Sequence, residues 1–166
     1  MDEPKEEKKA GAPIGNKNAE KWGVDFNNTS DFKNEKEYQT FIELNIELFC
    51  KDVLKLGAYV SHKTNKSIQK QGFTGTKERV DLFVVGKEKT AIIELKYPKN
   101  CFSEMRSAIS QVLHYSCVAD NCKIKYDKLC IVSPSYDERI FEVIKKYSLP
   151  IELYYLTKES HSRLEI

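Results

Sequence analysis

The sequence predicts an α/β domain, with a mixed central sheet that is flanked by helices on both faces. Two long stretches, 38–56 and 103–119, carry apolar residues at helical spacing, whereas short apolar runs at 79–85, 90–95 and 129–133 are typical of strands. The predicted order is α-β-β-β-α-β, then α-β. A chain of 166 residues is long enough to bury a substantial core within one domain.

The N-terminal part of the chain does not share this pattern. Residues 1–30 are expected to form a flexible tail, because 2–9 are charged without an apolar period and 11–18 are rich in turn formers. The folded domain is therefore expected over 31–166. The charged start also argues against a secretory signal.

A first helix is expected to begin after Ser30 or Asp31, since either side chain can cap it. Gly57 suits its end. A short strand is predicted at 58–62, followed by a polar, basic loop over 63–77 that contains no acid. The apolar residues at helical spacing are Tyr38, Phe41, Ile42, Ile46, Phe49, Val53 and Leu56.

The next two predicted strands each carry an acid. Asp81 lies on the first and Glu94 on the second, with Lys96 two residues later. Side chains two apart on a strand share a face, so Glu94 and Lys96 point the same way. The short gap at 86–89 suits a hairpin, which would bring the two acids together. Two carboxylates beside an ammonium suit a divalent cation and phosphodiester hydrolysis.

The second half of the chain completes the sheet. A helix over 103–119 precedes an almost wholly apolar run at 129–133, which is typical of a buried central strand. Pro134 ends that strand, and a short helix over 137–147 and a last strand over 149–156 follow.

The charge is unevenly distributed, although the net charge is only +2. Residues 51–100 carry eleven Lys/Arg and five Asp/Glu, whereas 1–50 carry seven and eleven. The basic excess coincides with the acid pair, which favours a polyanionic partner over a merely solvated face. The predicted nucleic-acid-binding residues are Lys63, Lys66, Lys70, Lys77 and Arg79.

Other patterns exclude some classes of protein. The five cysteines form no CxxC pair and lie mostly in apolar runs, which indicates reduced cysteines and a cytoplasmic protein. No run of about 18 apolar residues suggests a membrane span. No Walker-type glycine-rich loop suggests an NTPase.

These motifs resemble those of the PD-(D/E)XK nuclease superfamily, whose restriction-endonuclease-like fold has an αβββαβ core. The resemblance rests on Val80-Asp81 and Glu94-Leu95-Lys96, although the proline of the family's name is absent. Gln111 and Tyr115 share a helix face and resemble the QxxxY motif of its RecB-like branch. The resemblance covers roughly residues 35–133.

The opening helix resembles that of Shedu-type anti-phage nucleases and of mismatch-type nucleases in the superfamily. In such proteins a glutamate on this helix joins the metal site. The resemblance places that role on Glu35, with Glu47 and Glu43 as rivals.

The resemblance implies a DNA endonuclease that depends on Mg²⁺ or Mn²⁺. Lys96 would orient or deprotonate the attacking water or neutralise the transition state, and Gln111 would position Lys96 or contact the phosphate. The implied metal ligands are Asp81, Glu94, the Leu95 carbonyl and Glu35. The implied catalytic residues are Asp81, Glu94, Lys96, Gln111, Glu35 and Tyr115.

Several alternatives remain open at this level. The fold could serve as a catalytically inactive nucleic-acid-binding domain, although the intact acid–acid–lysine set argues against that. The substrate could be RNA or branched DNA instead of duplex DNA. A homodimer or larger homo-oligomer would suit duplex cleavage. The origin could be a phage, a mobile element or a defence system.

Overall fold

The computed structural model describes residues 32–68, 78–97, 101–135, 137–157 and 161–164, so the predicted tail lies outside it. The helices are α2 (Glu35–Leu44), α3 (Ile46–Leu48), the π-helix η2 (Phe49–Val53), α4 (Cys101–Asn121) and α5 (Glu138–Lys146). The strands are β1 (Tyr59–Ile68), β2 (Glu78–Gly86), β3 (Thr90–Leu95), β4 (Lys128–Ser133), β5 (Glu152–Leu156) and β6 (His161–Leu164). The predicted order of elements is confirmed, and β6 is an addition.

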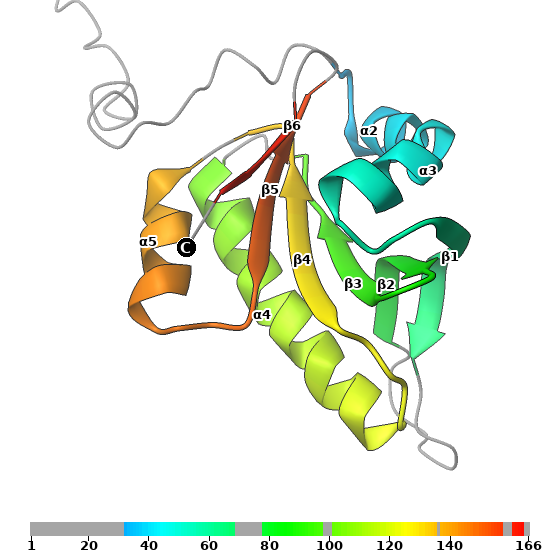
Figure 1. The fold of residues 1–166 in the computed structure, drawn as a ribbon. Helices are drawn as coiled ribbons and strands as arrows, with labels where there is room; N and C mark the ends of the chain where they lie inside the picture. The colour runs from blue at the N-terminus through cyan, green and yellow to red at the C-terminus, as the bar shows by residue number, and fades with distance from the viewer. Residues whose placement is uncertain (1–31, 69–77, 98–100, 136, 158–160, 165–166) are drawn as a thin grey trace, which may run out of the picture.

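The described strands form one six-stranded sheet in the order β1-β2-β3-β4-β5-β6. The pairs β1–β2, β2–β3 and β5–β6 are antiparallel, whereas β3–β4 and β4–β5 are parallel. The predicted mixed sheet is therefore correct. The parallel pairs are possible because α4 and α5 carry the chain back across one face of the sheet (Figure 1).

Two hydrophobic clusters cover the two faces of the sheet. On β3, Ala91, Ile93 and Leu95 pack with the helices α2, α3 and η2, whereas Ile92 packs with α4 and α5. Figure 1 shows the two groups of helices on opposite sides of the strands. Because side chains alternate along a strand, Glu94 lies on the same side as Ile92, toward α4.

The first helical segment differs from its prediction in two ways. Its N-cap is Asn34 rather than Ser30 or Asp31, since the Asn34 side chain accepts a hydrogen bond from the Glu37 N–H at 2.9 Å. It is also not one helix. Asn45 donates its side-chain N–H to the Phe41 carbonyl at 2.8 Å, and the regular helix gives way there to α3 and η2.

The predicted stop at Gly57 is confirmed. Its φ of +82° lies in the left-handed region, which disfavours residues with a side chain. A Cβ at this position would also lie 2.9 Å from the Glu88 Cγ atom. The glycine therefore lets the chain turn from η2 into β1.

The basic segment after residue 62 is partly strand, which corrects the prediction of a loop over 63–77. β1 continues to Ile68 and pairs with β2 through Lys66↔Val80 and Ser67↔Arg79. β1 pairs on one side only within the described sheet, and an edge strand accepts polar side chains that a central strand would not. Residues 69–77 lie outside the described part of the chain.

Candidate active site

The two strand acids lie side by side at one end of the β2–β3 hairpin. Leu82 is paired with Ile93, so Asp81 and Glu94 occupy the next position along the two strands. The Asp81 Oδ2 atom accepts a hydrogen bond from the Leu95 N–H at 2.9 Å. This bond fixes the Asp81 carboxylate against β3, next to Glu94. The expected convergence of the two acids is therefore present.

Lys96 completes this arrangement. Its Nζ atom lies 2.5 Å from the Glu94 Oε1 atom, with 15% and 1% of the two side chains exposed. The Lys96 backbone N–H donates to the Val132 carbonyl at 2.9 Å, which holds the residue in the β3–β4 ladder. The two acids and the lysine of the resembled motif thus lie at one site. We refer to Asp81, Glu94 and Lys96 below as the strand triad.

The strand triad contains two carboxyl groups but only one ammonium group. Burial and then the neighbouring Asp81 raise the pKa of Glu94 to about 7, although Lys96 acts against the shift. The buried Glu94 Oε2 atom has no hydrogen-bond partner among the described residues. A buried, unpartnered carboxylate oxygen is costly unless a positive charge meets it. Burial lowers the pKa of Lys96, but Glu94, Asp81 and Glu35 outweigh that effect and raise it.

Glu35 approaches the strand triad from α2. It is the first residue of that helix, directly after the Asn34 cap. Burial raises the pKa of Glu35, as do the nearby Asp81 and Glu104, whereas Lys96 lowers it. Glu35 and Lys96 line the same cavity.

The two rival glutamates lie elsewhere on the helical segment. Glu43 accepts a hydrogen bond from the Gln39 side-chain amide at 2.8 Å, and Glu47 is exposed on α3. Neither lines the cavity at the strand triad, whereas Glu35 does. The placement favours Glu35, and its role in binding metal stays a prediction.

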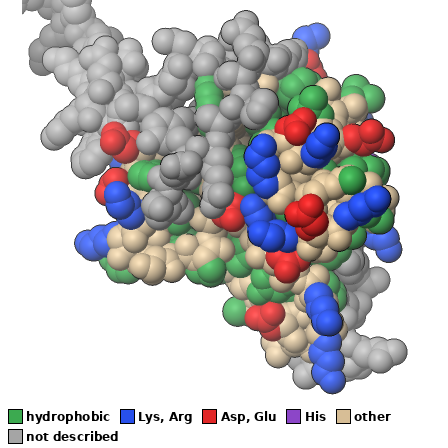
Figure 2. All heavy atoms as spheres, in the orientation of Figure 1, with side chains coloured by type: hydrophobic (Ala, Val, Ile, Leu, Met, Phe, Trp, Pro, Cys, Tyr) green, Lys and Arg blue, Asp and Glu red, His purple; other side chains and the backbone are tan. Residues whose placement is uncertain are grey.

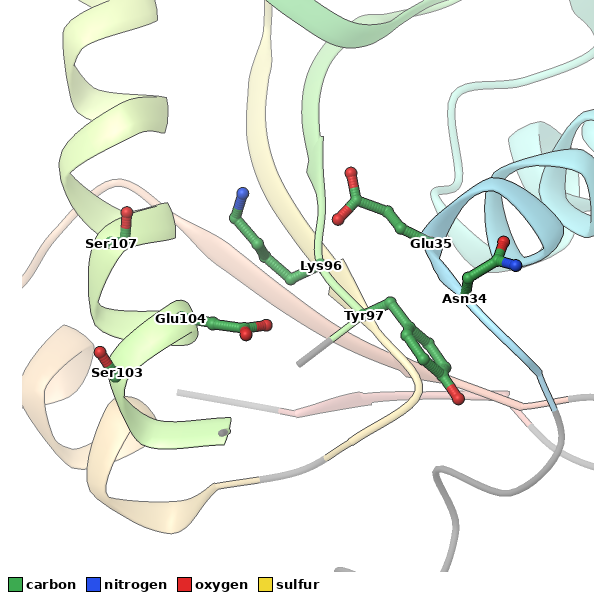
Figure 3. Close-up of a pocket in the computed structure, with 7 residues that line it drawn as sticks. All are labelled: Asn34, Glu35, Lys96, Tyr97, Ser103, Glu104 and Ser107. Carbon is green, nitrogen blue, oxygen red and sulfur yellow. The ribbon is translucent and has the colours of Figure 1, made fainter. Parts of the chain in front are cut away.

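A cavity of about 630 Å³ opens at this site. In Figure 3, Glu35 extends into it from the α2 side and Glu104 from the α4 side, with Lys96 between them. The lining residues are Asn34, Glu35, Lys96, Tyr97, Ser103, Glu104 and Ser107. The cavity thus combines an ammonium with carboxylates from two opposite helices.

Glu104 and Tyr97 were missed by the reasoning from the sequence. A signal for the α4 side was present, because Ser103, Ser107 and Gln111 recur every four residues and so mark one polar face of that helix. Nothing in the local pattern distinguishes Glu104 or Tyr97 from surface residues. Their position depends on how α4 and α2 meet the ends of the strands.

The two residues of the QxxxY motif have different environments. Gln111 is half-buried, and its Oε1 atom accepts a hydrogen bond from the Ser107 hydroxyl at 3.4 Å. Gln111 is thus one turn beyond a residue that lines the cavity. Tyr115 is only 5% exposed and packs in the hydrophobic cluster between α4 and the sheet. It does not line the cavity, and its implied catalytic role stays a prediction.

Binding of a divalent cation at the strand triad stays a prediction. No group of three or more His, Cys, Asp or Glu side chains suited to a metal occurs among the described residues. However, Mg²⁺ keeps several waters and is often held by only one or two carboxylates together with substrate phosphates. Asp81 and Glu94 supply two adjacent carboxylates, and the Glu94 Oε2 atom has no hydrogen-bond partner among the described residues.

The predicted nucleic-acid-binding residues are only partly described. Lys63 on β1 and Arg79 on β2 are exposed. Lys66 lies on β1, its side chain undescribed, and Lys70 and Lys77 lie outside the described residues. Figure 2 shows basic and acidic side chains interspersed on the face that carries α2 and α3, without a field of one sign. The binding role of these residues stays a prediction.

Comparison with known proteins supports the fold. A solved structure, described as the "crystal structure of a repair endonuclease from Pyrococcus abyssi", matches with a TM-score of 0.50 and 20% identity. The match covers 76% of this chain and 48% of that one, so it spans about half the length of that structure. No protein-family model and no curated protein matches the chain.

At that identity the likeness concerns the fold alone. Together with the order of elements and the mixed sheet, it defines an α/β protein with a restriction-endonuclease-like αβββαβ core. Among the described helices, none combines the length and the apolar character that a membrane span requires.

Proposed function

We propose that this protein is a metal-dependent nuclease that hydrolyses phosphodiester bonds in DNA. The observation that carries the proposal is the strand triad. A buried Glu94 carboxylate shares one oxygen with the Lys96 ammonium and leaves the other unpartnered beside Asp81. The half-paired Glu94 carboxylate beside Asp81 supports the proposal, because a divalent cation would meet the negative charge that the ion pair with Lys96 leaves over.

Asp81 and Glu94 are the residues that would hold Mg²⁺ or Mn²⁺, with the Leu95 carbonyl at the same strand end. The bound cation would supply positive charge and Lewis acidity at the scissile phosphate. The Leu95 N–H keeps the Asp81 carboxylate oriented. Cation binding would also favour the ionised form of Glu94, whose pKa is otherwise raised to about 7.

The remaining residues act on the water and on the phosphate. Lys96 would donate to a non-bridging phosphate oxygen and neutralise the charge that develops when water attacks phosphorus. Glu35, which reaches the cavity from the α2 side of Lys96, would accept a hydrogen bond from that water and orient it. Gln111 would hold Lys96 or the phosphate from α4, and Tyr115 would support that helix from the core.

The experiment is cleavage of supercoiled plasmid in the presence of Mg²⁺ or Mn²⁺, with EDTA as the metal-free reference. We expect nicking or linearisation that EDTA abolishes. Single-stranded RNA and a four-way DNA junction, assayed in parallel, identify the substrate class. Wild-type protein that binds DNA but cleaves no substrate would support the inactive binding domain instead.

A pair of lysine variants separates catalysis from stability. Lys96→Met should lower the cleavage rate at least about 100-fold while DNA binding persists. Lys128→Met is the matched control, because Lys128 is also poorly exposed, at 9%, and lies 3.0 Å from Glu152. That variant should lose stability but keep its cleavage rate per folded molecule.

A further inference from the structure

Tyr97 joins the end of β3 to the start of α2. It directly follows Lys96 and lines the cavity together with Glu35. Its hydroxyl donates a hydrogen bond to the Phe32 carbonyl, although the two residues are 65 positions apart in the sequence. The Tyr97 ring also meets the Phe32 ring edge-on, with the centroids 6.5 Å apart and an interplanar angle of 88°.

Phe32 is the anchor of the segment that leads into α2. Its side chain is 2% exposed and packs against Tyr38, with ring centroids 4.9 Å apart, and against Phe41, at 5.2 Å. The Asn34 cap and Glu35 follow within three residues. Whatever fixes the Phe32 carbonyl therefore also fixes where the first turn of α2 begins.

Tyr97 thereby relates the two halves of the site to one another. Glu94 and Lys96 come from β3, whereas Glu35 comes from α2, and no regular hydrogen-bond ladder joins these elements. The Tyr97–Phe32 bond is a polar link between them at the cavity. A catalytic group that arrives on a separate element needs such a link, because small errors in position cost large factors in rate.

We propose that Tyr97 is a positioning residue, which holds Glu35 at its working distance from Lys96 and Glu94 through the Phe32 carbonyl. The inference rests on the proposed nuclease function. Tyr97 itself does no chemistry in this account. It supplies the hydroxyl that sets the start of α2, and its ring closes one side of the cavity.

The test is Tyr97→Phe, which keeps the ring and removes only the hydroxyl. Tyr59→Phe is the matched control, since Tyr59 is likewise half-buried, packs on the same cluster and uses its hydroxyl in a hydrogen bond, here to His62 at 2.8 Å. We expect Tyr97→Phe to weaken Mn²⁺ binding, measured by calorimetry, and to slow plasmid cleavage, each about tenfold. Tyr59→Phe should change neither, and both variants should unfold at similar temperatures.

A double-mutant cycle shows whether Tyr97 acts through Glu35. If it does, adding Tyr97→Phe to Glu35→Gln should cause little further loss in either measurement. Fully additive losses, or a Tyr97→Phe protein that binds and cleaves like wild type while Glu35→Gln does not, would overturn the inference. Failure of the nuclease proposal looks different, because wild-type protein would then neither bind Mn²⁺ nor cleave any substrate.

Discussion

The Lys96 Nζ atom lies 2.5 Å from one oxygen of the Glu94 carboxylate, while the other oxygen of that carboxylate is buried and has no described partner. The ion pair is thus only half of what Glu94 can bind. The Leu95 N–H fixes the Asp81 carboxylate beside Glu94. Two carboxylates therefore lie together at this point, with the Lys96 ammonium paired to one of them. We propose that a divalent cation binds there.

The stability of the metal-free protein should depend on pH through Glu94. Burial, and then the charge of Asp81, raise its pKa from 4.5 to about 7. A carboxyl whose pKa rises on folding costs stability as the pH increases from the unfolded to the folded value. Between about pH 5.5 and about pH 8 the cost should grow by about 2 kcal/mol.

Urea unfolding in EDTA at the two pH values measures this cost. The Glu94→Gln protein should lose little stability over the same interval, because it has no carboxyl to ionise at this position. If the free energy of unfolding changed equally between the two pH values in wild type and variant, Glu94 would already be charged at the lower pH. Adding Mn²⁺ at the higher pH should restore stability to the wild type alone.

Asp81→Asn should lower the pKa of Glu94. The charge of Asp81 is the second cause of the raised value, after burial, and the substitution removes it. The amide oxygen can still accept from the Leu95 N–H, so the local backbone should persist. Titration of the carboxyl carbon of isotope-labelled glutamate by NMR measures the pKa directly.

The control for this titration is Asp127→Asn. Asp127 also accepts a backbone N–H of β3, from Thr90 at 2.7 Å, but at the other end of the strand. The Asp127→Asn substitution should therefore leave the pKa of Glu94 unchanged. An unchanged Glu94 pKa in Asp81→Asn would show that the two carboxylates do not interact.

Glutamine substitutions on the first helical segment should have unequal effects. Glu35→Gln should weaken Mn²⁺ binding and slow cleavage roughly 10- to 100-fold, since Glu35 lines the cavity beside Lys96. Glu43→Gln and Glu47→Gln should behave like wild type, because neither lines that cavity. A larger loss in either of these two variants than in Glu35→Gln would assign the role of the helix glutamate at the metal site to Glu43 or Glu47.

The exposed basic residues of β1 and β2 should contribute to DNA affinity without sequence preference. Lys63→Ala and Arg79→Ala should each weaken binding of duplex DNA and reduce the slope of log affinity against log salt by about 1. Lys145→Ala, an exposed lysine on α5, serves as control. Unchanged slopes in both β-strand variants would place the DNA elsewhere on the molecule.

The strand triad could be predicted because its geometry is local. Alternation along β3 puts Glu94 and Lys96 on one face, and a short connection over 86–89 fixes the register that brings Asp81 alongside. Both facts follow from residue spacing alone. The central strand and the helices on both faces could be predicted for the same reason, since their apolar periods are strong.

The other parts of the site depend on how separate elements meet. Glu104 on α4 and Tyr97 after β3 converge on one cavity with Glu35 of α2. No spacing in the sequence records that convergence. The extension of β1 to Ile68 was missed for a related reason, because an edge strand is defined by its pairing with β2 and not by an apolar pattern.

The most direct test of the central claim is a crystal of the protein soaked in Mn²⁺, with the metal located by its anomalous scattering. The account predicts a peak coordinated by carboxylate oxygens of both Asp81 and Glu94, with Lys96 beside it. A peak on other residues only, or Asp81 and Glu94 on separate sides of the sheet, would contradict it.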